Sequence, residues 1–310
     1  MGEIDIDELN RRYGAPGRIA FRKGFGGYPE AVLAGRYGTA EIALLGGSTL
    51  SYRPTGHSQV LFRPAKRDHR RGESFHGGIP VCWPQFGKLA IKGMAPHGFA
   101  KVMVFDVRGT AYSEEMTEIT LGLRSNGETR ALWPYDFDLE LKISVSMKLN
   151  LTLTTKNTGS TPFEFSAGFH PYFLVRDRDA VSVRGLDGCP YVYAEDMSEH
   201  VMSGDLKMDR ATDHVFTLPK APKHEFALLD PGLGRAVAVA SGGSGAAVVW
   251  NPGPGAGIND LEADDWRRFV CLEPVTSWPG PLAPLAPGET SVLVAAVQSV
   301  ADTSNGEVAP

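Results

Sequence analysis

The clearest pattern along the chain is a strict alternation of apolar and polar residues from Leu139 to Thr154. Every odd position of this segment is apolar and every even position is polar, which is the period of a β-sheet with one solvated face. One unbroken strand of this length would exceed the usual limit of about 10 residues. The pattern therefore predicts a hairpin whose turn lies between Ser146 and Lys148.

The rest of the chain consists of short apolar segments separated by glycine and proline. Residues 6–13 have the pattern of a short helix and few other segments are helical in pattern, and there is no βαβ alternation, internal repeat or linker. This organisation predicts one antiparallel all-β domain over residues 1–302, a large β-sandwich, followed by a disordered tail at 303–310. The predicted strands include residues 39–45, 49–54, 102–107, 119–123, 246–250, 269–274 and 291–297.

Composition and charge narrow the classes of partner. The 310 residues carry a formal charge of −5 with a pI near 5.9, which argues against nucleic acid and anionic membranes as partners. No apolar window is long enough for a transmembrane helix, and no signal peptide is expected. The sequence favours a monomer.

Cysteine and histidine spacing gives no sign of a metal or disulfide framework. The three cysteines, Cys82, Cys189 and Cys271, are widely spaced and odd in number, so a reduced, cytoplasmic protein is expected. The histidines lack H-E-x-x-H spacing. We therefore predict neither a metal nor an organic cofactor.

Two residues are candidates for acid–base chemistry. His170 follows the predicted hairpin and lies between aromatic residues, and Glu273 ends an apolar strand before a proline. Desolvation by such neighbours would raise the pKa of the glutamate toward the range of a usable base. The alternatives are a buried histidine bonded to a backbone carbonyl and an edge-strand glutamate in a salt bridge.

Other segments suit a sugar site. His97 is the one polar side chain of a Pro-His-Gly turn, and Asp213 can accept hydrogen bonds from hydroxyl groups, although a Thr-Asp pair at a turn also serves as a local cap. Aromatic rings can stack on the C–H face of a sugar, although a core position is the alternative for most of them. The rings considered are Trp83, Phe86, Phe99, Phe169 and Tyr172.

A set of motifs in a characteristic order extends this interpretation. The motifs are Gly77-Gly78-Ile79-Pro80-Val81-Cys82-Trp83-Pro84-Gln85-Phe86-Gly87, Pro96-His97-Gly98-Phe99-Ala100, Leu132-Trp133-Pro134, Phe169-His170-Pro171-Tyr172-Phe173, Thr212-Asp213 and Val270-Cys271-Leu272-Glu273-Pro274. From about residue 38 to residue 297 the chain resembles the glucose-6-phosphate 1-epimerases, or hexose-6-phosphate mutarotases, of the galactose-mutarotase-like superfamily.

The resemblance implies a β-supersandwich enzyme that interconverts the α and β anomers of a hexose 6-phosphate without a cofactor. By that analogy Glu273 is the general base for the C1 hydroxyl and His170 is the general acid for the ring oxygen. His97 would polarise the region of the ring oxygen, and Asp213 would bind hydroxyl groups. Gln85 and Phe99, which belong to the first two motifs, are counted among the substrate-binding residues.

The chain departs from the family at two positions. The family's arginines, thought to clamp the phosphate, are replaced here by His76 and Lys101. Neither an imidazole nor an ammonium group is equivalent to the bidentate guanidinium fork. Arg53, Arg63 or the basic segment 66–71 are possible substitutes. A mutarotase for an unphosphorylated aldose and a non-catalytic carbohydrate-binding domain are therefore the alternative functions.

Overall fold

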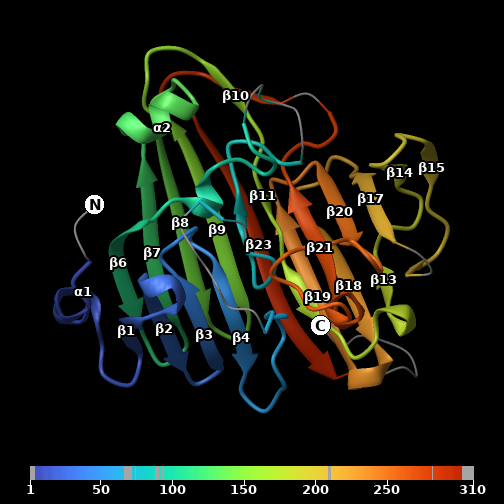
Figure 1. Ribbon diagram of the computed structural model, residues 1–310, viewed down its shortest axis with the longest axis horizontal. Helices are drawn as coiled ribbons and strands as arrows, with labels where there is room; N and C mark the ends of the chain where they lie inside the picture. The colour runs from blue at the N-terminus through green and yellow to red at the C-terminus, as the bar shows by residue number, and fades with distance from the viewer. Residues whose placement is uncertain are drawn as a thin grey trace.

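The computed structural model of the protein describes residues 4–65, 72–73, 75–87, 91, 94–208, 211–280 and 282–301, and for Phe25 the backbone alone (Figure 1). The predicted tail at 303–310 and the basic segment 66–71 lie outside the described residues. In the described ranges no helix combines the length and the apolar character that crossing a bilayer requires.

Two large sheets and two small ones make up the fold, and all the strand pairs described are antiparallel. The predicted antiparallel β-sandwich class is thereby confirmed. The nine-stranded sheet has the order β16 (Leu206–Lys207), β13 (Ser182–Arg184), β18 (His224–Asp230), β19 (Arg235–Gly242), β23 (Thr290–Ala301), β9 (Leu149–Asn157), β8 (Phe137–Val145), β7 (Thr117–Arg124), β6 (Asp106–Tyr112).

The eight-stranded sheet has the order β15 (Glu199–Val201), β14 (Pro190–Tyr193), β17 (Thr212–Thr217), β20 (Ala246–Asn251), β21 (Phe269–Val275), β11 (Gly168–Phe169), β5 (Val81–Cys82), and β12 (Tyr172–Leu174) also pairs with β21. The small sheets are β1 (Ile19–Lys23), β2 (Pro29–Gly35), β3 (Gly38–Ala43), β4 (Thr49–Pro54), and the pair β10 (Phe163–Phe165) with β22 (Ala283–Leu285).

Helical segments are short. The α-helices are α1 (Ile6–Tyr13) and α2 (Gly127–Leu132). The 3₁₀ turns are η1 (Phe25–Gly27), η2 (Ala100–Val102), η3 (Arg178–Ala180), η4 (Pro231–Leu233) and η5 (Asp265–Arg268). The predicted helix at 6–13 is confirmed with the same bounds.

The predicted hairpin is confirmed as β8 and β9. Its turn closes with a hydrogen bond from the Ser146 amide to the Lys148 carbonyl of 2.9 Å. Leu141 is paired with Leu153 and Ile143 with Leu151, so the odd positions share one buried face. The burial of this apolar face stabilises the pairing, since each buried leucine contributes about 1.5–3 kcal/mol relative to an exposed one.

Three local predictions are wrong. Residues 102–105 are not strand, because Ala100–Val102 forms a 3₁₀ turn and β6 begins only at Asp106. Helix α2 was not predicted, although Asn126 and Thr129 form a capping box at its start. Glu273 does not end its strand, because β21 continues to Val275 between two other strands.

The core lies between the layers. In Figure 1 the strands β1–β4 cover β6–β9 on one side, and β2 packs against β7 and β8. One continuous apolar cluster links this part to the eight-stranded sheet, where it includes Val249 and Leu272. The opposite face of the eight-stranded sheet is therefore free to carry a different kind of surface.

Candidate active site

The alternation of β21 separates core residues from site residues. Val270 and Leu272 join the large core cluster, whereas Cys271 and Glu273 point to the opposite face of the sheet. β21 is a central strand, with β20 on one side and β11 and β12 on the other. Pairing on both sides holds the backbone of Glu273 in a fixed position.

The strand register aligns further residues beside these two. One row across the sheet is Asp213, Trp250, Cys271 and Tyr172, and the next row contains Val215, Val248 and Glu273. Directly opposite residues on antiparallel strands have Cβ atoms about 4.5–5.5 Å apart. Tyr172 and Cys271, which are far apart in the chain, thus meet because of strand pairing, which the sequence by itself does not reveal.

His170 lies between β11 and β12, and its backbone is fixed by hydrogen bonds. Its amide donates to the Pro80 carbonyl at 3.1 Å, and the amide of Tyr172 donates to the Gly78 carbonyl at 2.8 Å. The imidazole stacks on the Tyr172 ring, with centroids 4.8 Å apart and an interplanar angle of 14°. The segment 78–80 is therefore a wall against which the histidine is held.

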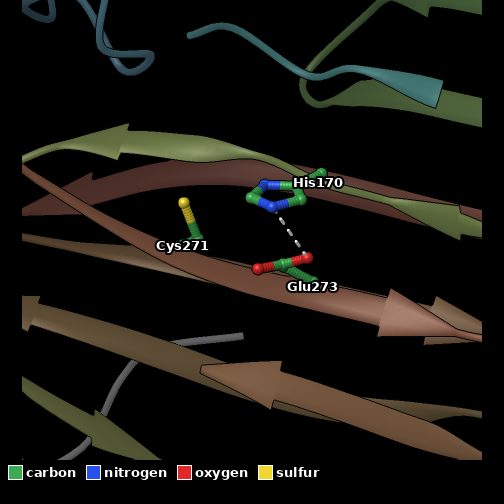
Figure 2. Close-up of side chains that lie close together, drawn as sticks. All are labelled: His170, Cys271 and Glu273. Carbon is green, nitrogen blue, oxygen red and sulfur yellow. Dashed lines mark ion pairs between the residues drawn. The ribbon is translucent and has the colours of Figure 1, made fainter. Parts of the chain in front are cut away.

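The imidazole and the carboxylate meet at the floor of the site. His170 Nε2 lies 3.4 Å from Glu273 Oε2, as Figure 2 shows. Glu273 is only 1% exposed, and neither of its oxygens nor His170 Nδ1 has a hydrogen-bond partner among the described residues. A buried polar group without a partner costs about 1–3 kcal/mol. This cost is typical of a site prepared for a ligand.

A cavity of about 490 Å³ opens above this pair. A second cavity of about 640 Å³ adjoins it and shares Asp213 and Trp250 in its lining. The first cavity contains the acid–base candidates, so it is the one that matters for chemistry. Its lining consists of Phe75, His76, Pro80, Cys82, Phe86, Gly87, His97, Lys101, His170, Tyr172, Ala194, Met197, Asp213, Val248, Trp250, Glu273 and Trp278.

Burial determines the protonation of the pair. Desolvation raises the pKa of Glu273 well above its ordinary value, and the nearby Asp213 adds to the effect. Desolvation lowers the pKa of His170 well below its ordinary value, with further contributions from His97, His76 and Lys101. Burial therefore favours the neutral form of both groups, with the proton on the carboxyl group.

His97 is held in an uncommon conformation. Its φ of 63° is in the left-handed region, and its amide donates to the Gly87 carbonyl at 2.9 Å. The Gly87 amide lies 3.3 Å from His97 Nδ1. The His97 ring lies edge-on to the His170 ring, with ring centroids 5.2 Å apart. A non-glycine residue at positive φ costs about 1–3 kcal/mol and often occurs at a functional site.

The turn at His97 depends on the next residue. A Cβ atom added to Gly98 would lie 2.1 Å from the Trp83 carbonyl oxygen, so only glycine fits there. The Ala100 amide also donates to this carbonyl, at 3.1 Å. The motif Pro-His-Gly-Phe-Ala is thus a compact turn that presents one imidazole to the cavity.

Lys101 and His76 face the same cavity. Desolvation lowers the pKa of Lys101, and among the described residues its ammonium group has no carboxylate within ion-pair distance. His76 is paired with Asp260 at 2.7 Å. The cavity wall thus combines Lys101 and imidazoles, which suits an anionic group on a ligand.

Two predicted substrate-binding residues do not line the cavity. Gln85 is completely buried, donates to the Ala95 carbonyl at 2.8 Å and accepts from the Ile91 amide at 2.8 Å. Phe99 packs edge-on against Trp83 in the core. Both residues shape the loops of the site, and a direct contact of either with the substrate stays a prediction that this placement does not support. Trp83 and Phe169 also lie in the core, whereas Phe86 and Tyr172 line the cavity.

Two arginines considered as substitute phosphate contacts also lie away from the cavity. Arg63 is paired with Glu41, and neither Arg63 nor Arg53 is part of the cavity lining. Asp213 lies within β17 and not at a turn, so the alternative role as a turn cap is wrong. The substitute segment 66–71 lies outside the described residues.

Sequence reasoning missed three residues at the site. Trp250 and Trp278 line the cavity, and Asp260 binds His76 from a loop after β20. Trp250 had a usable signal, because it shares the alternation of the predicted strand at 246–250 with Val248. No local pattern marks Trp278 or Asp260, because their roles depend on loops that fold back onto the sheet.

One group of potential metal ligands occurs among the described residues. The ligand atoms of His170, Cys271 and Glu273 all lie within 4.8 Å of one another, and Figure 2 shows the three side chains converging. Imidazole, thiolate and carboxylate are donors that zinc accepts. Desolvation raises the pKa of the Cys271 thiol well above its ordinary value, so a metal would have to displace protons from both Cys271 and Glu273.

Comparison with known proteins defines the family. A model of the aldose 1-epimerases matches residues 32–297, so the chain belongs to the aldose 1-epimerase family. The protein is therefore an isomerase of the class that interconverts the anomers of an aldose. The fold and family expected from the motifs are confirmed.

Individual relatives show which members of the family this chain is similar to. A candidate glucose-6-phosphate 1-epimerase from Escherichia coli K12 is 32% identical over 238 residues, covering 76% of this chain and 78% of that protein. One from the plant Cenchrus ciliaris is 28% identical over 262 residues, covering 80% and 78%. The crystal structure of a candidate mutarotase from Salmonella typhimurium has a TM-score of 0.85 at 26% identity, covering 96% of this chain and 99% of that one.

Proposed function

We propose that the protein is a hexose-6-phosphate mutarotase, in which His170 and Glu273 open and reclose the sugar ring. The observation that carries the proposal is the buried carboxyl group of Glu273, which has no hydrogen-bond partner among the described residues and lies 3.4 Å from His170 Nε2 in the cavity. The sugar's hydroxyl groups and ring oxygen would supply the missing partners.

The reaction needs two proton transfers. The carboxylate of Glu273 takes the proton from the C1 hydroxyl while the imidazolium of His170 gives a proton to the ring oxygen. The bond between C1 and the ring oxygen breaks, which leaves an aldehyde at C1 and a hydroxyl at C5. Rotation about C1–C2 exposes the other face of the aldehyde, and the reverse transfers close the ring. Both oxygens are bonded to C1 in the closed ring, so an adjacent acid and base can reach them.

The starting protonation state follows from the pair. Desolvation raises the pKa of Glu273 and lowers that of His170, so burial favours a neutral pair with the proton on Glu273. Moving this proton across the 3.4 Å gap produces the carboxylate and the imidazolium that the reaction needs. Hydrogen bonds from bound hydroxyl groups, including those held by Asp213, would stabilise the charged form.

Several features support a phosphorylated substrate. Lys101, His76 and His97 all line the cavity and provide cationic or hydrogen-bonding groups for a phosphate. The relatives from Escherichia coli and Cenchrus ciliaris are named as candidate glucose-6-phosphate 1-epimerases. A desolvated lysine binds phosphate as a point charge, so it can substitute for part of an arginine clamp.

The test is anomeric exchange on pure sugars. Magnetisation-exchange NMR would measure the rate for glucose 6-phosphate, glucose and galactose at equal concentrations. A higher kcat/KM for the phosphosugar supports the proposal. A preference for a free sugar would indicate a mutarotase for unphosphorylated aldoses. Absence of exchange with all three sugars would contradict the proposal.

A further inference from the structure

Asp260 lies outside the cavity but is bound to a residue that lines it. Its Oδ2 accepts a hydrogen bond from the His76 backbone amide at 2.8 Å, and its Oδ1 lies 2.7 Å from His76 Nδ1. One carboxylate therefore fixes both the backbone and the side chain of His76. The two residues are 184 positions apart in the chain, so this contact exists only through the tertiary structure.

The contact leaves one ring nitrogen for a ligand. A carboxylate on Nδ1 fixes the orientation of the ring, and an imidazole whose Nδ1–H donates to a carboxylate offers Nε2–H to an anion in its imidazolium form. The His76 side chain is 30% exposed and lines the cavity, whereas that of Asp260 is 17% exposed and does not. Asp260 therefore acts on a ligand indirectly, through the cavity residue His76 that it holds.

The loop that carries Asp260 is anchored beneath the cavity. Leu261, the next residue, packs on the cluster that contains Tyr172 and Phe269. The His76 ring makes an edge contact with the Tyr172 ring at 6.3 Å, and Tyr172 stacks on His170. His76 is thus held at a defined position relative to the acid–base pair, with Tyr172 between them.

The charge of Asp260 is maintained despite its burial. Desolvation opposes ionisation of this carboxyl group, but the hydrogen bond and charge of His76 outweigh it and lower its pKa. The carboxylate is therefore a lasting partner for the imidazole at neutral pH. In the same cavity Lys101 has no carboxylate partner among the described residues.

We propose that Asp260 is a positioning residue for substrate recognition, which holds His76 so that its Nε2 contacts the anionic substituent of the substrate. The inference rests on the function proposed above, because it assigns the phosphate of the sugar to the His76 end of the cavity. It adds a residue that does not touch the substrate and that determines preference for phosphorylated over free sugar.

The experiment compares Asp260→Asn, His76→Gln and the double variant with the wild type. Asp260→Asn is expected to raise the KM for glucose 6-phosphate about tenfold, which is about 1.4 kcal/mol, while kcat changes less than about twofold. The ratio of kcat/KM for glucose 6-phosphate to that for glucose should fall by about the same factor. The double variant should lose no more than His76→Gln alone, because both changes remove one contact.

A matched control lies on the same loop. Asp264 is exposed and makes no side-chain cap, so Asp264→Asn removes the same charge four residues away without touching His76. For Asp264→Asn, the ratio of kcat/KM for glucose 6-phosphate to that for glucose should equal the wild-type ratio. The variant Asp260→Asn with His76→Arg should regain the preference for phosphosugar, because a guanidinium is charged without a carboxylate partner. A merely structural role of Asp260 predicts no such rescue.

Two outcomes would overturn the inference. In the first, Asp260→Asn weakens the reaction of both sugars equally. In the second, the loss of phosphosugar preference in the double variant equals the product of the losses in Asp260→Asn and His76→Gln. If the wild type exchanges neither sugar, the proposed function fails, and calorimetric titration with glucose 6-phosphate still decides the inference. Weaker binding by Asp260→Asn than by Asp264→Asn would support it, and equal binding would contradict it.

Discussion

Two buried glutamates on central strands have opposite surroundings. Glu30 on β2 of the four-stranded sheet is 3% exposed and lies 3.2 Å from Arg22, which in turn contacts Glu41 at 2.7 Å. Glu273 on β21 is 1% exposed and has no cation and no hydrogen-bond donor bound to its oxygens among the described residues, apart from the imidazole 3.4 Å away. The first arrangement is that of a structural carboxylate.

Two of the buried histidines, His170 and His224, repeat this contrast. His170 and His224 are equally buried, and each has a ring nitrogen without a partner among the described residues. His224 lies on β18 and does not line the cavity. His170 lines the cavity, and its Nε2 lies 3.4 Å from Glu273 Oε2. An unsatisfied polar group alone therefore does not identify a site. The convergence of two such groups on one cavity does.

The largest expected difference between these regions is in turnover. Glu273→Gln and His170→Ala should each lower kcat by about a hundredfold or more, the usual scale for a general acid or base. Glu30→Gln and His224→Ala are the matched controls and should retain turnover close to the wild type in the folded protein. Exchange NMR on glucose 6-phosphate measures all four, and near-normal kcat in either cavity variant would contradict the assigned roles.

The next largest difference is in stability. Relative to the wild type, Glu30→Gln should lower the free energy of unfolding and Glu273→Gln should raise it. Glu30→Gln removes a charge paired with the half-exposed Arg22 and should lower the free energy of unfolding by about 1 kcal/mol. Burial raises the pKa of Glu273, so the stability that its neutral form provides is lost as the pH rises through that raised pKa. Glu273→Gln cannot ionise and should be more stable than the wild type at neutral pH.

Denaturant titrations at about pH 4 and about pH 7 measure these effects. The advantage of Glu273→Gln over the wild type should grow between these two values by up to about 1.4 kcal/mol per pH unit, because the glutamate ionises in the unfolded chain above about 4.3 while burial favours its neutral form in the folded protein. A difference that is the same at both values would show that burial does not raise the pKa of the carboxyl group.

A smaller effect is expected in the pH dependence of catalysis. The active pair holds one proton, which is lost above the raised pKa of Glu273, and a second proton is added below the lowered pKa of His170. The acidic limb of the kcat/KM profile with glucose should therefore lie below the ordinary histidine value. An acidic limb centred on the ordinary histidine value of about 6.5 would contradict the desolvation of His170.

The smallest expected effect is that of a chelator. Two proton transfers accomplish the reaction, so incubation with EDTA followed by dialysis should leave kcat within about twofold of its starting value. Loss of activity that zinc restores would instead assign a metal to the group formed by His170, Cys271 and Glu273. Cys271→Ser would then weaken the restoration.

The fold class followed from local patterns because strand signals repeat along the whole chain. The alternation at 139–154 determined the hairpin of β8 and β9, including its turn, since a shift of one residue would expose every leucine. The short helix α2 escaped prediction because tertiary packing outweighs intrinsic propensity for six residues. Similarly, 102–105 is as apolar as a strand but follows a 3₁₀ turn.

For the site, the sequence determined which residues have the right chemistry, because motifs around His97, His170 and Glu273 restrict the backbone through glycine and proline. Only the tertiary structure decided which of them face the cavity. Gln85 and Phe99 belong to the same motifs and point elsewhere, and Asp260 belongs to none of them and binds His76. The physical reason is that burial and strand register depend on the pairing of distant segments, whereas motifs describe only neighbours along the chain.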